Sequence, residues 1–337
     1  MNFLYIGQCE KGSTSRMRFE ILKSHLDSKL NLINISEVIN SSNKIVRSIG
    51  WRYKIGPLIW RISKLINKHI EGNEFYDLIW IDKGVFIPFE IIEKLRSKTN
   101  KLVHFTPDPA FFYHKSRLFY ESIPLYDYCI TTKTYEIDLY KKYGAKNVLY
   151  CTQGYDERIH KPLHKFEDKQ YEVCFIGHYE KNRGEILQQL IDSNIQVILA
   201  GIKWKSFVYR NKNKGNLIYF GENLAGIDYV ETISNSYISL GLISNWVPEK
   251  HTTRTFEIPA CGTLLITPRN EEIYGFFKEN EVVYFEQETE IADMIKRLLN
   301  DKKTLNKIID NGTRKVESGN YSYQRQIETL LKSIQKI

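Results

Sequence analysis

Short apolar runs alternate with amphipathic segments along the whole chain, and this alternation limits the fold more than any other feature. Runs of about this length, rich in Ile, Val, Leu and aromatic residues, are typical of parallel strands covered by helices on both faces. The sequence therefore predicts an α/β protein. We expect strands at residues 3–6, 30–35, 78–81, 101–105, 128–131 and 148–150, and again at 173–176, 197–200, 217–220, 238–242, 264–267 and 282–285.

The same rhythm occurs twice, so the chain is expected to contain two similar units. Its 337 residues can form two hydrophobic cores, since about 150 residues suffice for one. The segment 154–170 is polar and lacks a clear period, which predicts a linker. We expect one domain over residues 1–160, against which a C-terminal helix over 321–337 could pack, and a second over 171–320. In the first half, helices are expected at 15–26, 57–70, 88–97 and 135–143.

Cysteine usage and charge restrict the compartment and the partners. The five cysteines are scattered and include no CxxC pair, which argues against a disulfide framework and a zinc site. The first residues lack a basic segment, and no apolar run approaches the roughly 18 residues that span a bilayer. We therefore expect a cytoplasmic protein. The net charge of +8 favours an anionic partner, such as nucleic acid, acidic lipid or phosphorylated small molecules.

Two α/β units joined by a hinge are expected to face an interdomain cleft, and parallel sheets bind ligands at the carboxyl ends of their strands. The loop GQCEKGSTSR (7–16) follows the first strand, so Gly12 and Ser13 could bring backbone N–H groups to a phosphate, with Arg16 beside them. The alternative is a flexible connection in which Ser15 caps a helix and Arg16 lies on a solvated face.

The second unit begins in a similar way, with the segment FIGHYEKNRG (175–184). Gly177 ends a strand and Arg183 enters a helix, where a guanidinium can hold a diphosphate with paired N–H donors. The alternative is a surface arginine near a turn. Further on, Glu257 enters a helix that ends at Gly262 and leads into a buried strand, so its carboxylate could reach the hydroxyls of a ribose or a sugar.

The residues around Glu257 carry a resemblance to a known family. EIPACGTLLIT (257–267) resembles the E-A-M-A-C-G-T-P-V-I-A signature of GT-B glycosyltransferases, particularly the glycosyltransferase 4-like group and the allied CgeB-like proteins. FIG (175–177), IYFG (218–221), SYISLG (236–241) and QGYDERIHKP (153–162) resemble other motifs of that family, in the same order. The resemblance spans residues 148–300 and implies two Rossmann-like domains in the GT-B arrangement.

The resemblance implies a nucleotide diphosphate sugar held mainly by the second domain and an acceptor held by the first. By position, Glu257 would contact the ribose, and Arg183 and Arg254 would neutralise the diphosphate. Glu249 and Glu257 stand in an E-x7-E arrangement, which implies a catalytic role for Glu249 and retention of anomeric configuration. His251, in the same loop, is a further donor-binding candidate. No DxD motif occurs, so a metal-bridged mechanism is disfavoured, and we expect no cofactor and no metal.

In the first unit, the stretch from His104 to Asp108 lies at the carboxyl end of a predicted central strand, where both residues could orient an acceptor hydroxyl as catalytic residues. The alternative for this stretch is a turn beside a buried aromatic cluster. Lys133 follows the next strand and is another cleft candidate.

Residues 44–70 are strongly basic. Residues 38–70 contain seven Lys or Arg and no acid, and the helix expected over 57–70 has an apolar arc and a basic arc. With Trp51 and Trp60 flanking it, the helix could rest on an anionic membrane, which would make the protein peripheral on the inner face. The alternative is a core helix with a solvated basic face.

The sequence thus predicts a glycosyltransferase of polysaccharide biosynthesis that acts on a glycan, lipid-linked or surface-polymer acceptor. Two alternatives share the fold: a catalytically inactive shell that serves as a binding or assembly protein in cell-surface maturation, and a sugar-nucleotide epimerase. Nucleic-acid binding ranks last, because no recognised module is present.

Overall fold

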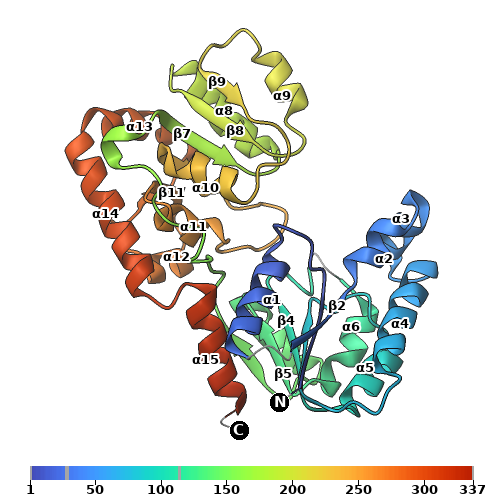
Figure 1. The fold of residues 1–337 in the computed structure, drawn as a ribbon. Helices are drawn as coiled ribbons and strands as arrows, with labels where there is room; N and C mark the ends of the chain where they lie inside the picture. Colours follow the sequence, from blue (N-terminus) through green and yellow to red (C-terminus); the bar gives the residue numbers. More distant parts are fainter. Residues whose placement is uncertain (1, 27–29, 113–114, 336–337) are drawn as a thin grey trace. The chain divides into compact units, whose positions relative to one another are not determined.

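The computed structural model describes residues 2–26, 30–112 and 115–335, so the last two positions of the expected C-terminal helix lie outside the described residues. The chain divides into two compact units. Unit 1 comprises Met1–Thr152 and Gln326–Ile337, and unit 2 comprises Gln153–Arg325. Figure 1 shows the elements of both units along the chain.

Unit 1 is built on a parallel sheet of six strands in the order β2-β1-β3-β4-β5-β6. All six strands expected in the first half are present, with small shifts at their ends. Their apolar runs are buried because helices cover both faces of the sheet. The strands are β1 (Phe3–Gly7), β2 (Leu30–Asn34), β3 (Tyr76–Asp82), β4 (Thr99–Thr106), β5 (Tyr128–Thr131) and β6 (Val148–Tyr150).

Helices cover the two faces of this sheet. In Figure 1, α1 and α15 lie on one side of the sheet and α4 and α5 on the other. Ser13 caps α1 by accepting a hydrogen bond from the backbone N–H of Arg16, and Pro57 occupies the first turn of α4. The helices are α1 (Thr14–His25), α2 (Ser36–Ser41), α3 (Lys44–Tyr53), α4 (Pro57–Ile70), α5 (Phe89–Arg96), α6 (Arg117–Ser122), α7 (Ile137–Lys142) and α15 (Tyr323–Gln335), with short 3-10 turns η1 (Ile123–Leu125) and η2 (Thr134–Glu136).

Unit 2 repeats the plan with a second parallel sheet of six strands, in the order β12-β11-β10-β7-β8-β9. All six strands expected in the second half are present, so the α/β prediction is confirmed for both units. They are β7 (Tyr171–Ile176), β8 (Val197–Ala200), β9 (Leu217–Tyr219), β10 (Ser236–Leu240), β11 (Leu264–Pro268) and β12 (Val283–Phe285).

The helices of unit 2 pack on both faces of its sheet. One core joins the sheet to α8, α9, α13 and α14, and a second joins it to α10, α11 and α12. The helices are α8 (Lys181–Asp192), α9 (Lys205–Arg210), α10 (Ile227–Ser234), α11 (Arg254–Ala260), α12 (Glu271–Phe276), α13 (Ile291–Asn300) and α14 (Lys302–Ser318), with 3-10 turns η3 (Phe166–Asp168) and η4 (Glu288–Glu290).

The polar segment 154–170 belongs to unit 2, so the division falls earlier than the linker expected from the sequence. The backbone N–H of Leu163 donates to the Ser234 hydroxyl over 2.7 Å. Lys169 is buried and donates to the carbonyl of Ser236 over 3.2 Å. Burial lowers the pKa of this lysine to about 8. Hydrogen bonds in both directions therefore tie this polar segment to the rest of unit 2.

All five cysteines are free and buried. Among the described residues, no helix combines the length and apolar character needed to cross a bilayer.

Candidate functional site

The carboxyl ends of β7 and β10 in unit 2 lead into the loops that carry the donor-binding candidates. Gly177 follows β7, and a Cβ at this position would lie 2.8 Å from Nη1 of Arg254 and 2.9 Å from the ring of Phe175. The absence of a side chain lets the Arg254 guanidinium lie directly on the strand end, where its Nη1 donates to the carbonyl of Ile176 over 2.7 Å. The observed position of the Arg254 side chain therefore requires a residue without a Cβ at position 177.

Arg183 and Arg254 meet at this edge from two different helices. Arg183 lies in the first turn of α8 and Arg254 begins α11. Both guanidinium groups donate to the same acceptor, the carbonyl of Leu242, each over 3.4 Å. Both also lie within 6 Å of the centre of the Phe175 ring. The two positive charges are therefore held side by side on a buried aromatic ring.

The charges around this pair are only partly balanced. Arg183 has 1% of its side chain exposed and pairs with the equally buried Glu180 over 3.0 Å. Burial and the charge of Arg254 lower the pKa of Arg183 to about 10, against the opposing effects of Glu180 and Glu249. Arg254 is half-buried. Within the described part of the chain, its hydrogen bonds go only to backbone carbonyls. An anion beside Arg254 would relieve the repulsion between the two cations.

Glu257 lies one helical turn after Arg254 and is held in place by three side chains of unit 2. Its Oε2 accepts hydrogen bonds from the Tyr229 hydroxyl over 2.7 Å and from Thr253 over 3.0 Å. Its Oε1 lies 3.6 Å from Nε2 of His160. Nδ1 of His160 contacts both the backbone N–H of Asp156, at 3.0 Å, and its carbonyl oxygen, at 3.1 Å, and these contacts hold the ring beside Glu257. Oε2 thus accepts two hydrogen bonds, whereas Oε1 has lone pairs that can accept another.

This arrangement can bind a ligand that carries both an anion and hydroxyl groups. Charge-assisted hydrogen bonds from a guanidinium suit a phosphate or diphosphate, and a fixed carboxylate oxygen suits a sugar hydroxyl. Arg183, Arg254 and Glu257, which the sequence analysis placed in one site, are brought together by the structure.

His251 has its two ring nitrogens engaged within unit 2. Nδ1 pairs with Oε1 of Glu272 over 2.5 Å, and Nε2 accepts from the backbone N–H of Gln153 over 2.8 Å. Its ring is 1% exposed and packs edge-on against Phe256 and Phe276. These contacts explain why a histidine occupies the loop: it ties the start of unit 2 to α12. Donor binding by His251 would require these bonds to break.

Glu249 is half-buried in the loop between β10 and α11. Its charge acts on Arg183, so it lies close to the arginine pair. Its catalytic role stays a prediction.

In unit 1, Gly12, Ser13 and Arg16 lie in the loop between β1 and α1, as expected. Gly12 has a φ of 81°, in the left-handed region that favours glycine. The Ser13 hydroxyl donates to the carbonyl of Glu10 over 2.8 Å while it caps α1. Arg16 pairs with Glu20 over 2.5 Å on an exposed helix face. The helix cap is therefore Ser13 and not Ser15, and the roles of these residues in donor binding stay predictions.

Asp108 follows β4 and pairs over 2.6 Å with Lys83, which follows the neighbouring strand β3. About a third of the Asp108 side chain is exposed (33%), so this carboxylate lies at the surface of the carboxyl edge of unit 1. Beneath it, Asp82 is held by Arg18 over 2.7 Å and by the Tyr5 hydroxyl over 2.8 Å, all fully buried. This buried network supports the strand ends that carry Lys83 and Asp108.

His104 lies in the aromatic core and not at the surface. Its ring stacks on Phe119 with the ring centres 4.3 Å apart, and its Nε2 bonds the carbonyl of Lys83 over 3.1 Å. Burial lowers its pKa to about 4. In this conformation the ring offers no nitrogen to an acceptor. Lys133 follows β5 and is 2% exposed, so it too is buried.

Sequence reasoning missed the residues that support Arg183 and Glu257. Glu180 pairs with Arg183, while Tyr229, Thr253 and His160 contact Glu257. Glu180 could have been found, because it directly precedes the helix of Arg183 and lies three residues away from it. Tyr229 and His160 carry no local signal, since they lie far from Glu257 in the sequence.

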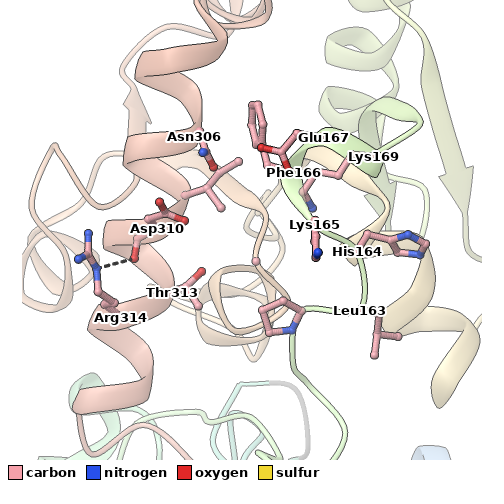
Figure 2. A pocket seen from close by; sticks show the side chains of 13 residues that line it. Leu163, His164, Lys165, Phe166, Glu167, Lys169, Asn306, Asp310, Thr313 and Arg314 are labelled. Carbon is pink, nitrogen blue, oxygen red and sulfur yellow. Dashed lines mark hydrogen bonds between the residues drawn. The ribbon is translucent and has the colours of Figure 1, made fainter.

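A separate cavity of about 560 Å³ lies elsewhere in unit 2, between the segment 162–169 and α14 (Figure 2). None of the candidate site residues lines it. Its lining residues are Pro162, Leu163, His164, Lys165, Phe166, Glu167, Lys169, Gly262, Asn306, Ile309, Asp310, Thr313 and Arg314.

Two units, each a six-stranded parallel sheet with helices on both faces, define the class: the chain has the GT-B fold. Residues 183–332, slightly less than half of the chain, match the family model described as "Glycosyl transferase-like". The matched region includes Arg183, Arg254 and Glu257. The resemblance to GT-B glycosyltransferases is thereby confirmed, while the CgeB-like subgroup remains a prediction.

Several solved structures share the fold over nearly the whole chain. Sucrose-phosphate synthase from Thermosynechococcus elongatus is similar with a TM-score of 0.70 and 12% identity over 100% of both chains. HepE from Anabaena, in complex with UDP and glucose, has a TM-score of 0.66 and 13% identity over 99% of this chain and 100% of its own. A glycosyltransferase from Rickettsia africae has a TM-score of 0.68 and 14% identity over 99% and 98%. No curated protein sequence matches the chain.

Proposed function

We propose that the protein is a glycosyltransferase that moves a sugar from a nucleotide diphosphate sugar to a glycan, lipid-linked or surface-polymer acceptor. The observation that carries this proposal is the pair Arg183 and Arg254, held on one carbonyl beside the fixed carboxylate of Glu257. The family match over residues 183–332 supports it. The similar HepE structures contain UDP and UDP-glucose, which are ligands of the kind this site suits.

The donor would be bound as follows. Arg254, which is half-buried, contacts the diphosphate, and the buried Arg183 raises the positive potential from behind. Oε1 of Glu257 accepts a ribose hydroxyl while Tyr229 and Thr253 hold Oε2. When the sugar leaves, negative charge develops on the diphosphate, and a preorganised cation in a low-dielectric site stabilises this charge more than water does.

The two arginines would supply this stabilisation without a metal ion, and the anomeric configuration would be retained if Glu249 acts as the family's first Glu. Asp108 of unit 1 would orient the acceptor hydroxyl, since its carboxylate is partly exposed and Lys83 holds it in place. Addition of a chelator should leave the transfer rate unchanged. A rate that disappears with the chelator and returns with a divalent cation would contradict this part of the proposal.

Calorimetric titration of the full chain with UDP-glucose and with GDP-, dTDP- and other nucleotide sugars tests donor binding. Saturable binding of at least one of them is expected, and the anomer of the product then reports retention or inversion. Failure of all of them to bind would contradict the proposal.

A second candidate is a GT-B shell without catalytic activity that binds a nucleotide sugar during cell-surface assembly. The observation that favours it is His251. Both ring nitrogens of this residue are bonded, so the loop before α11 lacks the backbone freedom that small residues would give it. Slow hydrolysis of a bound donor in the absence of acceptor separates the two, since an inactive shell shows none. Interconversion of the donor sugar would instead indicate an epimerase.

Replacing Glu257 with Gln is expected to weaken donor binding by about 1 kcal/mol, or roughly fivefold in Kd, because a hydrogen bond to a charged acceptor becomes a bond to a neutral one. The folded structure should be kept, since the amide oxygen can still accept from Tyr229. Calorimetry measures the change, with Glu317→Gln on the exposed face of α14 as the matched control. Equal donor affinities of the two variants would show that the ribose does not bind at Glu257.

Replacing Gly177 with Ala is expected to displace the Arg254 guanidinium from the carbonyl of Ile176, because the new methyl group would lie 2.8 Å from Nη1. If the displaced guanidinium no longer bonds the diphosphate, one charge-assisted hydrogen bond is lost. UDP binding should then weaken by about 1.5 kcal/mol, or near tenfold in Kd. The control is Gly215→Ala, whose Cβ meets no atom within 4 Å. A Gly177→Ala variant that folds and binds UDP as the control does would show that Arg254 is not a diphosphate ligand.

A further inference from the structure

Helix α3 and the beginning of α4 in unit 1 expose large apolar side chains. The exposed fractions are 72% for Ile45, 40% for Ile49, 59% for Tyr53, 59% for Ile55 and 62% for Trp60. Ile45, Ile49 and Tyr53 are spaced by four residues and therefore lie on one face of α3. Ile55 lies in the turn between the two helices, and Trp60 lies in the first turn of α4. We call these five residues, with the cations between them, the α3–α4 surface.

The opposite side of α3 already serves the core of unit 1. Gly50 is buried, and a Cβ there would lie 2.4 Å from the Leu58 side chain of α4, so this side chain packs directly on the backbone of α3. Trp51 is half-buried and packs edge-on against Phe86, with the ring centres 4.8 Å apart. Trp51, which was expected to flank a membrane contact together with Trp60, therefore belongs to the core side. The exposed stripe is not needed for packing within unit 1.

The two helices also carry six cations. Lys44, Arg47 and Arg52 lie on α3, and Arg61, Lys64 and Lys68 lie on α4, while residues 38–70 include no Asp or Glu. Nζ of Lys64 lies 5.2 Å from the centre of the exposed Trp60 ring. Beside it, a shallow depression of about 440 Å³ is lined by Trp60, Ser63, Lys64, Asn67, Lys68 and Glu71. The surface therefore combines apolar side chains with a cationic border.

We propose that the α3–α4 surface binds a bilayer that contains anionic phospholipid. Lys and Arg near such a bilayer are attracted to its surface charge, and Trp and Tyr side chains favour the level of the headgroups, with apolar neighbours inserted below. A second copy of the chain fits this surface poorly, because cations of one copy would face cations of the other across the interface. The inference concerns a contact of unit 1 and does not depend on sugar transfer.

Co-sedimentation of the full chain with vesicles tests the proposal. Vesicles of phosphatidylcholine mixed with phosphatidylglycerol are expected to bind the protein, and binding should weaken as salt is added. Vesicles of phosphatidylcholine alone should bind at least about tenfold less protein, because the cationic border contributes only at a charged surface.

Two sets of variants separate the contributions of charge and apolar area. The triple variant Lys44→Gln, Arg47→Gln and Arg52→Gln removes three charges while retaining good helix formers, and it should bind the anionic vesicles about tenfold less tightly. Its matched control is Lys296→Gln, Lys303→Gln and Lys307→Gln in unit 2, which removes the same charge from exposed positions of α13 and α14. The pair Ile49→Ser and Trp60→Ser should also reduce binding about tenfold at unchanged charge.

The outcomes are distinct. Equal loss in the triple variant and its control would show that net charge alone acts, and the proposal would fall. Absence of vesicle binding would also overturn the proposal. The same holds if the protein instead binds nucleic acid or associates with itself, and if the pair Ile49→Ser and Trp60→Ser abolishes that interaction. Calorimetry with UDP on the same variants should match the wild type. Vesicle binding without UDP binding would contradict the proposed glycosyltransferase and leave the membrane contact standing.

Discussion

Replacing Arg183 with Met is expected to lower the free energy of unfolding by about 3 kcal/mol, because it leaves the carboxylate of Glu180 buried without its guanidinium. Glu180 has 1% of its side chain exposed. Two contacts compensate in part: Nε2 of His178 at 2.9 Å and the backbone N–H of Asn245 at 3.2 Å. Chemical denaturation measures the loss, with Arg210→Met on the exposed face of α9 as the control.

A second substitution separates stability from donor binding. The double variant Arg183→Met, Glu180→Leu removes both charges, so most of the lost stability should return, since apolar groups often replace a buried pair without cost. UDP affinity should stay reduced by about tenfold or more, because the positive potential behind Arg254 is still missing. A double variant with wild-type affinity would show that Arg183 serves only the fold. A single variant as stable as the control would contradict the buried ion pair.

Unfolding free energy is expected to fall by about 2 kcal/mol between pH 8 and pH 5 because of His104. Burial lowers the pKa of this histidine from 6.5 to about 4 in the folded state. Below pH 6.5 the unfolded chain therefore binds a proton that the folded chain excludes, and protonation favours unfolding. The loss starts near pH 6.5 and is complete near pH 4, and denaturant titrations at a series of pH values measure it.

The variant His104→Phe isolates this contribution. Phe can occupy the ring position stacked on Phe119, and it cannot take up a proton. Its unfolding free energy should therefore vary about 2 kcal/mol less than that of the wild type over the same pH range. His69→Gln, at an exposed position of α4, should retain the wild-type profile. Identical profiles for wild type and His104→Phe would contradict the assignment.

Local patterns predicted the strands well and the helices of unit 1 less completely. All twelve strands were predicted, because a parallel strand that is buried on both faces has a continuous apolar sequence. Such a run is a local signal in the sequence. Helices α2, α3 and α6 were not predicted, and the reason is clearest for α3. Its apolar stripe faces outward, and its contact with α4 depends on Gly50, a residue that weakens a helical pattern.

The candidate site was predicted in part. Family motifs located Arg183, Arg254 and Glu257, yet they did not indicate that Arg183 is buried behind Arg254 or that Tyr229 and His160 hold Glu257. For His104 and His251, the positions after or between strands suggested a surface role. The structure buries both rings among aromatic residues.

The sequence by itself determined the α/β class, the number and position of the strands and the residues eligible to bind a donor. These properties depend on neighbours along the chain, whose spacing is visible in the sequence. Only the tertiary structure decided that Arg183 and Arg254, 71 positions apart in the numbering, meet on the carbonyl of Leu242. Strand order and register bring such residues together, and both result from the packing of distant segments that no local pattern specifies.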